Sequence, residues 1–524
     1  MVLALLLGGL APAAAAAPAG VAGAVMVPAS VEPGALLDGT PPQPDSPIKT
    51  RLAATRLTIA GETMHLGRLR RFYALHDFQP VWPGRPDQAK SLAKAIAAAG
   101  GMGLDPALFH AAALADADGL PAADRDILLS DAFLAYADAL ARGAVPGEQR
   151  GDNEALSPGP VDVVAALDAA LAAADPAAAL AALAPHLPGY AGLQRAYQTY
   201  VAIAKAGGWP HVGEAPPEER LRQLQRRLAA ERYLPPGYET GQFDEATAAA
   251  LRQFQARHGL EPDGKLGPAT LAELNVPAEA RVHQLAVNLE RWRWLPRSLP
   301  AERVWVNTAS MQLQYFRDDR PVFTGRVIVG EPDKQTPEFA ATINSLLYNP
   351  PWNVPYSIAV KEIWPKLETE PDYLERHNMV MRDSGAVTQL PGAGTALGRL
   401  KFEMEDRFDV YLHDTPLRYL FARENRRLSH GCVRVQNPRE LAALLLQEPV
   451  DTINKGIALG YTSRRTLAAP VPVFIVYQTA FIGADGGLEF RRDAYRRDEA
   501  IWNRLSRNSQ VPVAGQEAPA QRRG

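Results

Sequence analysis

The sequence predicts a multidomain α+β protein in which a mainly β domain follows two helical regions. Three observations lead to this prediction. The chain has 524 residues, a length typical of two to four domains. Apolar residues recur with a helical period up to about residue 275, and from about residue 303 they alternate with period two. Glycine (41) and proline (45) are frequent enough to indicate linkers and many turns.

The first 28 residues are expected to be a secretory signal peptide or an uncleaved anchor. No charged residue precedes Glu32, and an apolar run from Leu3 to Leu10 leads into small residues around Ala13–Ala17 that suit cleavage. The run is shorter than a typical membrane span and is interrupted by Gly and Pro. This pattern favours export, and therefore a periplasmic location. Residues 29–50, which are rich in Pro, are expected to be a disordered linker.

Residues 51–206 are expected to form a helical scaffold domain. Leu92, Ile96 and Leu104 belong to an alanine-rich helical pattern that a Gly-Gly pair interrupts, and the helical period returns over residues 131–141 and 161–173. No cluster of catalytic side chains is apparent in this stretch. A structural role is therefore favoured, and residues 207–218 are expected to be a second linker.

Residues 218–276 are expected to be a compact three-helix unit. Leu221, Leu224 and Leu228 share one helical face, and Asp244 is placed to cap a second helix. The pair Gly267-Pro268 opens a third helix. The string GQFDEATAAALRQFQARHGLEPDGKLGPATLAELN resembles the type 1 peptidoglycan-binding domain, and this resemblance implies a wall-binding module.

Residues 301–500 are expected to form the mainly β domain. A hairpin is expected where the turn at residues 317–320 joins two β-rich runs, and a segment of about 357–385 is expected to be a helical and loop-like capping insertion. The tail, 507–524, is expected to be disordered. The expected strands are Val304–Asn307, Met311–Phe316, Val322–Val329, Val410–His413, Val471–Tyr477 and Leu488–Phe490.

Charge and cysteine content exclude several classes of function. The formal net charge is −3, so no global positive field would gather nucleic acid. A single cysteine, Cys432, can form neither an internal disulfide nor a four-thiolate zinc site. The ten histidines show no H-E-x-x-H or H-x-H pattern, so neither a metal nor another cofactor is expected. An unpaired thiol in an exported protein suggests that the thiol is used, the alternative being a buried apolar cysteine.

The stretch YLHDTPLRYLFARENRRLSHGCVRV carries the candidate catalytic residues. A thiol is mostly protonated at neutral pH, and a nearby imidazole can take its proton and return it to a leaving amine. Both His413 and His430 are candidates, and sequence distance does not decide between them. Gly431 permits a tight turn whose N–H groups can face a developing oxyanion. Ser429 and Arg434 add donors on either side, and the cation favours a thiolate or a substrate carboxylate.

The pattern HDTP…SHGCVRV resembles the active-site motif of the L,D-transpeptidases (the YkuD catalytic domain). The order of helical scaffold, peptidoglycan-binding module and catalytic domain with a capping insertion resembles the YcbB-like subgroup, and implies a mainly β YkuD-type sandwich. The residues that this resemblance assigns are Cys432 as acyl-accepting nucleophile, His413 as general base, the Asp414 carbonyl as the group that orients it, His430 and Gly431 in the oxyanion loop, and Tyr411 in the pocket wall. Many members carry Asn at the position of Arg434, and some YcbB-like relatives carry Ser at the position of His430.

The resemblance implies a 3→3 cross-linking reaction in cell-wall biogenesis. Cys432 would attack diaminopimelate at position three of a tetrapeptide stem, release the terminal D-alanine and pass the acyl group to a second diaminopimelate. Carbapenems would acylate the same thiol. The implied partners are stem peptides and glycan strands, together with cell-wall synthases and, through an uncleaved leader, the membrane; nucleic acid is not expected.

Alternatives remain open at this stage. The same acyl-enzyme would serve an L,D-carboxypeptidase or the attachment of lipoproteins or D-amino acids. A non-catalytic peptidoglycan-binding scaffold is the alternative from another class of protein. A serine D,D-transpeptidase is disfavoured, because Ser91-x-x-Lys94 lies in a plain helical pattern and the chain has no K-T-G triplet.

Overall fold

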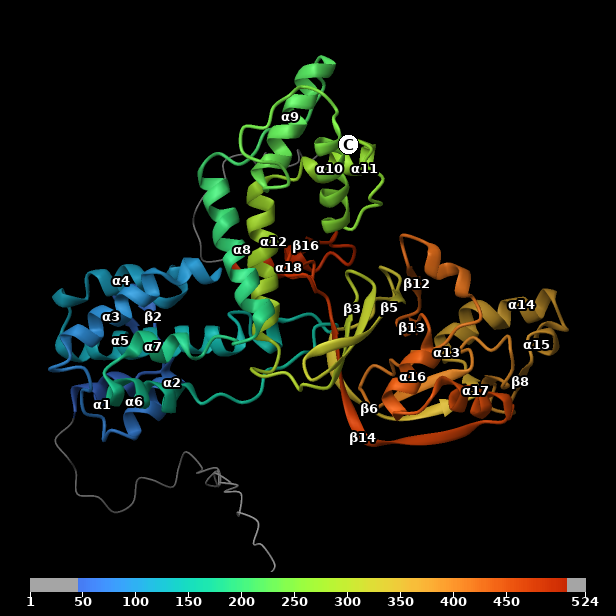
Figure 1. Ribbon diagram of the computed structural model, residues 1–524. Coiled ribbons are helices and arrows are strands. Elements are labelled where there is room, and N and C mark those ends of the chain that lie inside the picture. Colours follow the sequence, from blue (N-terminus) through green and yellow to red (C-terminus); the bar gives the residue numbers. More distant parts are fainter. Residues whose placement is uncertain (1–45, 507–524) are drawn as a thin grey trace, which may run out of the picture.

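The computed structural model describes residues 46–506 (Figure 1). The expected leader (1–28), most of the expected linker (29–50) and the expected tail (507–524) lie outside these residues. One part of the linker prediction is wrong, because helix α1 spans Pro47–Leu52. Pro47 occupies the first helical turn, where its missing N–H costs nothing, and Ile48 and Leu52 are buried in the scaffold core. Among the described residues, no helix is both long and apolar enough to cross a membrane.

The scaffold is a helical domain organised around one buried helix, α5 (Ala122–Arg142). Almost every side chain of α5 from Asp126 onward is buried, so the other helices surround it. It also contains a small hairpin, β1 (Thr58–Ile59) with β2 (Glu62–Thr63). The surrounding helices are α2 (Leu66–Ala74), α3 (Pro86–Ala97), α4 (Ala111–Ala115), α6 (Val163–Ala173), α7 (Pro176–Ala181) and α8 (Pro188–Lys205).

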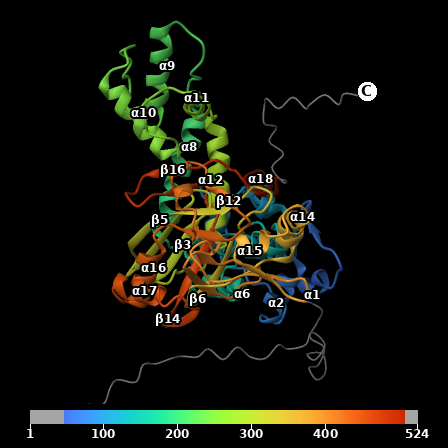
Figure 2. The ribbon, with the colours of Figure 1, turned by 90° about the vertical axis from the view of Figure 1, so that its right-hand side faces the viewer.

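Two long helices connect the three regions of the chain. Helix α8 runs alongside α12 (Ala278–Arg293), which the sequence analysis left unassigned between the peptidoglycan-binding unit and the β domain. Figures 1 and 2 show the three helices of that unit standing at one end of this pair, away from the sheet. They are α9 (Pro217–Ala230), α10 (Glu245–Arg257) and α11 (Pro268–Leu274). Their common core includes Leu228, Leu251 and Phe254, and the Asp244 carboxylate caps α10 by accepting the Thr247 N–H at 2.8 Å.

The expected mainly β domain is confirmed as a nine-stranded mixed sheet with short helices. Its order is β12-β5-β13-β11-β10-β6-β14-β3-β4, and β4 also pairs with β5, so the sheet closes on itself around an apolar interior. The strands are β3 (Arg303–Asn307), β4 (Gln312–Arg317), β5 (Arg320–Gly330), β6 (Phe339–Tyr348), β10 (Leu400–Met404), β11 (Leu412–His413), β12 (Arg427–Ser429), β13 (Val433–Val435) and β14 (Ser463–Val476).

The segment between β6 and β10 forms a small unit of its own, which we call the cap (residues 352–389). It is wider than the insertion expected over about 357–385, and it contains a three-stranded sheet as well as helices. A separate apolar cluster that includes Val354, Ile363 and Val387 holds it together. Its elements are β7 (Trp352–Asn353), α13 (Tyr356–Ile358), the π-helical turn η5 (Ala359–Ile363), α14 (Trp364–Thr369), α15 (Tyr373–Arg376), β8 (Met379–Met381) and β9 (Val387–Gln389).

The C-terminal part of the described chain returns to the other regions. Helices α16 (Pro438–Leu446) and α17 (Val450–Ala458) pack against each other beside the sheet. The hairpin β15 (Ala480–Ile482) with β16 (Leu488–Phe490) reaches α8 and α10, and α18 (Asp498–Leu505) packs against α12.

Candidate active site

The site is built on two adjacent parallel strands. In the register of β11 and β13, Leu412 lies opposite Val433 and His413 opposite Arg434, and the Val433 N–H donates to the Tyr411 carbonyl at 3.1 Å. Neighbours across a sheet point to the same side, as do residues two apart along a strand. Tyr411, His413, Cys432 and Arg434 therefore share one face, with the imidazole diagonal to the thiol.

His413 is held as a neutral base with a fixed tautomer. Its ring is buried, and Nδ1–H donates to the Asp414 carbonyl oxygen at 2.6 Å. The ring also has a backbone hydrogen bond with Leu397, and in the Nδ1–H tautomer Nε2 is the proton acceptor. Burial and the positive charge of Arg434 lower the pKa of His413 to about 3. The Asp414 carboxylate accepts the N–H groups of Arg399 (2.9 Å) and Thr415 (2.8 Å), and these bonds fix the carbonyl that orients the imidazole.

Cys432 is a protonated thiol beside Tyr411. Burial raises the pKa of the Cys432 thiol, although hydrogen bonds from the backbone and hydroxyl of Tyr411 oppose this effect. The Tyr411 hydroxyl also receives a hydrogen bond from Trp352 of the cap, and its ring lies 5.5 Å from the His413 ring. The thiol and the imidazole are therefore both uncharged at neutral pH, and their chemistry requires proton transfer during attack rather than a preformed ion pair.

The turn before the thiol requires glycine. Gly431 has φ +119°, a conformation that side chains rarely adopt. Its N–H donates to the Ser429 hydroxyl at 3.2 Å, and that hydroxyl donates to the Cys432 carbonyl at 2.6 Å. The Thr336 hydroxyl donates to the Gly431 carbonyl at 2.7 Å. The Gly431 amide, expected in the oxyanion loop, is thus engaged within the turn in this conformation.

His430 faces the cap instead of the thiol face. Its Nε2 lies 2.6 Å from the Glu362 carboxylate on η5, and Lys334 lies 3.8 Å from the same carboxylate. The glycine turn therefore separates the two histidines that the sequence left as alternatives: His413 shares a face with Cys432, and His430 connects the loop to the cap.

A cavity of about 780 Å³ opens between these strands and the cap. Sheet residues and cap residues both line it, among them Cys432, His413, Arg434, Trp352 and Glu362. The Nε of Arg434 is buried and has no hydrogen-bond partner within residues 46–506. Burial lowers the pKa of Arg434. A guanidinium stays charged in proteins, so the cavity offers a cation to an anionic ligand.

Sequence reasoning missed a polar cluster in the scaffold. Asp131 lies 3.0 Å from His65 and 2.9 Å from His110, and His110 also reaches Glu62 at 3.2 Å. Burial disfavours the charge on Asp131, but hydrogen bonds from His110 and His65 outweigh burial and lower its pKa. These side chains therefore serve as hydrogen-bond partners for one another. Their wide spacing in the sequence offers no local motif that could have revealed the cluster.

Three regions of the chain match families of known proteins. Residues 301–473 match the L,D-transpeptidase catalytic domain, residues 67–196 match a family described as scaffold domain, and residues 217–274 match a putative peptidoglycan binding domain. A putative L,D-transpeptidase of Haemophilus influenzae is 35% identical over 243 residues, a match that covers 42% of this chain and 48% of that protein. The chain thus spans about half the length of this curated relative.

Two solved L,D-transpeptidase structures show a weaker likeness. The one from Xylanimonas cellulosilytica (residues 123–326) is 18% identical, covers 51% of this chain and 97% of its own, and has a TM-score of 0.19. The one from Stackebrandtia nassauensis is 16% identical, covers 51% of this chain and 96% of its own, and has a TM-score of 0.20. These scores are too low to establish a shared overall fold.

The family matches define the class of the catalytic region. Residues 301–473 match the catalytic domain of the L,D-transpeptidases, an acyltransferase family with a cysteine nucleophile. The helical scaffold and peptidoglycan-binding regions of the chain precede that domain, in the YcbB-like arrangement.

Proposed function

We propose that this chain is an L,D-transpeptidase of the cell envelope that forms 3→3 cross-links between diaminopimelate residues of peptidoglycan. The observation that carries the proposal is the shared face of β11 and β13, which joins Cys432 and a neutral, tautomer-fixed His413 in one cavity. The match of residues 301–473 supports the reaction class, and the peptidoglycan-binding region supports the substrate class. A periplasmic location follows from this substrate.

Acylation would proceed with proton transfer from thiol to imidazole. As Sγ of Cys432 attacks the carbonyl of the third stem residue, its proton passes to Nε2 of His413. The tetrahedral intermediate then collapses, the bond to the terminal D-alanine breaks, and the departing amine takes the proton from Nε2. The products are a thioester on Cys432 and free D-alanine. Breaking the contact between Gly431 and Ser429 would free one amide for the oxyanion.

Deacylation would reverse these proton movements. The side-chain amine of a second diaminopimelate attacks the thioester, His413 removes a proton from it, and the thiolate leaves and is reprotonated. The unpartnered Arg434 cation suits a carboxylate of the stem, and the cap supplies the opposite wall of the cavity. An uncharged thiol in the resting state also limits adventitious oxidation.

Mass spectrometry of products from purified disaccharide-tetrapeptide tests this proposal. We expect the full chain to release D-alanine and form a 3→3 dimer, and Cys432→Ala to form neither while still binding sacculi. Ser357→Ala, on the cap side of the same cavity, is the matched control and is expected to retain the dimer. A tripeptide product without dimer would make the enzyme a carboxypeptidase, and the absence of any carbapenem adduct on Cys432 would favour a non-catalytic scaffold.

A further inference from the structure

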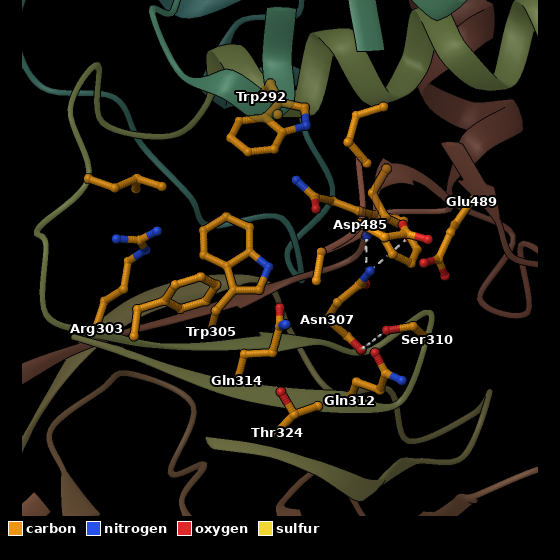
Figure 3. Close-up of a pocket in the computed structure, with 18 residues that line it drawn as sticks. Trp292, Arg303, Trp305, Asn307, Ser310, Gln312, Gln314, Thr324, Asp485 and Glu489 are labelled. Atoms are coloured by element: carbon orange, nitrogen blue, oxygen red, sulfur yellow. Dashed lines mark hydrogen bonds between the residues drawn. The ribbon is translucent and has the colours of Figure 1, made fainter. Parts of the chain in front are cut away.

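A second cleft, of about 420 Å³, lies between the outside of the sheet and the long helices (Figure 3). Strands β3, β4 and β5 form its floor, Trp292 of α12 and Gly189 of α8 lie on the helical side, and the β15–β16 hairpin closes one end. None of the residues that line it also lines the cavity of Cys432. It is therefore a separate site that the transpeptidation chemistry does not use.

The floor of the cleft is an aromatic and amide surface produced by strand alternation. On β3, Val304 and Val306 point into the apolar interior, so Arg303, Trp305 and Asn307 point outward. Trp305 lies opposite Gln314, and Asn307 opposite Gln312. Gln312 and Gln314 have no side-chain hydrogen-bond partner within the described chain. The Asn307 side chain, in contrast, makes two 3.0 Å hydrogen bonds with the backbone of Gln478 and so fixes the position of Gln478. Figure 3 shows the two glutamines rising from the strand toward the cleft.

Three buried donors at the cleft lack acceptors, and one of them is Nε of the Arg303 guanidinium. The indole Nε1 of Trp292 and the amide Nε2 of Gln478 are buried without a hydrogen-bond partner in residues 46–506, and these residues are only 8% and 3% exposed. Figure 3 shows the Trp292 indole reaching into the cleft above Trp305, and the two rings lie 5.9 Å apart. Buried donors without partners cost stability, and a molecule bound in the cleft that reaches these donors would relieve that cost by supplying oxygen acceptors.

The charged groups around the cleft are already neutralised. Asp485 accepts from Arg257 at 2.8 Å, and Glu489 accepts from Arg491 at 2.6 Å. Arg303 is held by Asp319 at 2.6 Å. A ligand here meets aromatic rings and neutral amides. Each charged group that the structure describes in the cleft wall has an ion-pair partner, while Nε of Arg303 lacks an acceptor.

We propose that this cleft binds a saccharide, namely a chain of N-acetylated pyranose sugars. The C–H faces of such rings pack on aromatic side chains. Their hydroxyl and acetamido oxygens can accept from Trp292 and Gln478, and their hydroxyl and amide hydrogens can be donated to Gln312 and Gln314. The proposal does not depend on the transpeptidase activity, because it concerns sugars without stem peptides.

Titration of the full chain with chitotetraose, a tetramer of N-acetylglucosamine that lacks any peptide, tests the proposal. Calorimetry measures the affinity, and quenching of tryptophan fluorescence reports contact with the cleft. We expect saturable binding that Gln314→Ala and Gln312→Ala each weaken by about 2- to 10-fold, the range for loss of one hydrogen bond. Trp292→Phe, which removes the indole donor but keeps an aromatic ring, is expected to weaken binding by a similar factor, with its melting curve checking the fold.

Two control variants make the result decisive. Cys432→Ala is expected to bind chitotetraose as tightly as the wild-type chain does, so failure of the proposed enzymatic function would leave this result unaffected. Gln253→Ala replaces an exposed glutamine on α10 of the peptidoglycan-binding unit and is expected to have no effect. No binding at millimolar sugar, or binding that Gln253→Ala weakens and the cleft variants do not, would overturn the proposal.

Discussion

At His413, burial and a neighbouring positive charge change the pKa of the imidazole in the same direction. Burial and the neighbouring Arg434 both lower the pKa of the imidazole, to about 3, so the ring stays a neutral acceptor well below pH 6.5. As the pH is lowered, the acylation rate is therefore expected to fall only far below pH 6.5, where His413 becomes protonated. Arg434→Gln removes one positive charge, which raises the pKa of His413 and moves this low-pH fall of the rate (the acid limb) to higher pH.

This shift is measured as the rate of Cys432 acylation by a carbapenem between pH 4 and pH 8. Arg423→Gln, an exposed arginine on the loop before β12, is the matched control and is expected to leave the profile in place. An acid limb that stays fixed in Arg434→Gln would show that Arg434 does not act on His413.

The two histidines are expected to differ strongly in their effect on acylation. His413→Ala removes the imidazole that shares the strand face of the thiol, so a loss of about 10²–10⁴-fold is expected, the usual contribution of a general base. His430→Ala removes a contact to Glu362, and its effect on acylation is expected to stay below about 10-fold. The measurement is the single-turnover acylation rate of both variants. Equal losses would reassign the base.

Residue identity and strand periodicity select the candidate residues of this site, whose catalytic roles stay predictions. Cys432 and His413 stand out because one thiol and one strand-end imidazole occur in a motif whose glycine permits the turn, and the described φ of Gly431 agrees with that reasoning. The contact between His430 and Glu362 joins residues 68 apart, and no local pattern encodes it. The engagement of the Gly431 amide by Ser429 depends on side-chain rotation, which sequence does not fix.

At the scale of elements, helix α12 shows where sequence reasoning failed. Its buried positions include Glu290, Arg291 and Arg293, which a periodicity argument reads as solvent-facing. Each charge finds a partner on another region: Glu290 accepts the Val145 N–H at 2.8 Å, and Arg291 pairs with Asp498 at 2.5 Å. A helix at the junction of domains is buried on several sides, so its charged side chains pair with tertiary partners and its apolar stripe is blurred.

The cap is expected to open more readily when its contact with the catalytic loop is removed. Glu362 on η5 joins the cap to His430 at 2.6 Å and to Lys334 at 3.8 Å. Glu362→Ala removes both interactions. Because partly exposed pairs are worth at most about 1 kcal/mol, the open population is expected to rise by about 2- to 5-fold. Labelling of Cys432 by a bulky maleimide should accelerate by that factor, whereas labelling by small iodoacetamide should change less.

A glutamate elsewhere on the cap provides the control for that experiment. Glu370 pairs with Arg376 within the cap itself, so Glu370→Ala should leave the labelling rates of both reagents unchanged. Equal rates in Glu362→Ala and the wild-type chain would show that apolar packing alone, and not the Glu362 contacts, keeps the cap in place.

At the scale of the whole molecule, the hairpin β15–β16 joins the peptidoglycan-binding unit to the catalytic domain. Arg257, at the end of α10, donates to Asp485 at 2.8 Å, and the His258 ring stacks on Phe490 at 5.4 Å. Arg491 donates to the Arg257 carbonyl at 3.0 Å. The unit that is expected to hold the wall is therefore fixed in orientation relative to the cavity of Cys432.

A methyl group at Gly487 is expected to weaken this junction without disturbing either domain. The new Cβ would lie 2.3 Å from Cζ of Arg257, so the guanidinium must move away and lose Asp485. Since a flexible side-chain end absorbs the clash, the melting temperature should change little. If orientation by the junction matters, Gly487→Ala will cross-link isolated sacculi more slowly while processing soluble disaccharide-tetrapeptide at the wild-type rate. Gly486→Ala, next to it, has open space at its Cβ but φ +80°, so it strains the turn without touching Arg257 and bounds the effect of strain alone. Equal sacculus rates in the wild-type chain and Gly487→Ala would show that the two regions work independently.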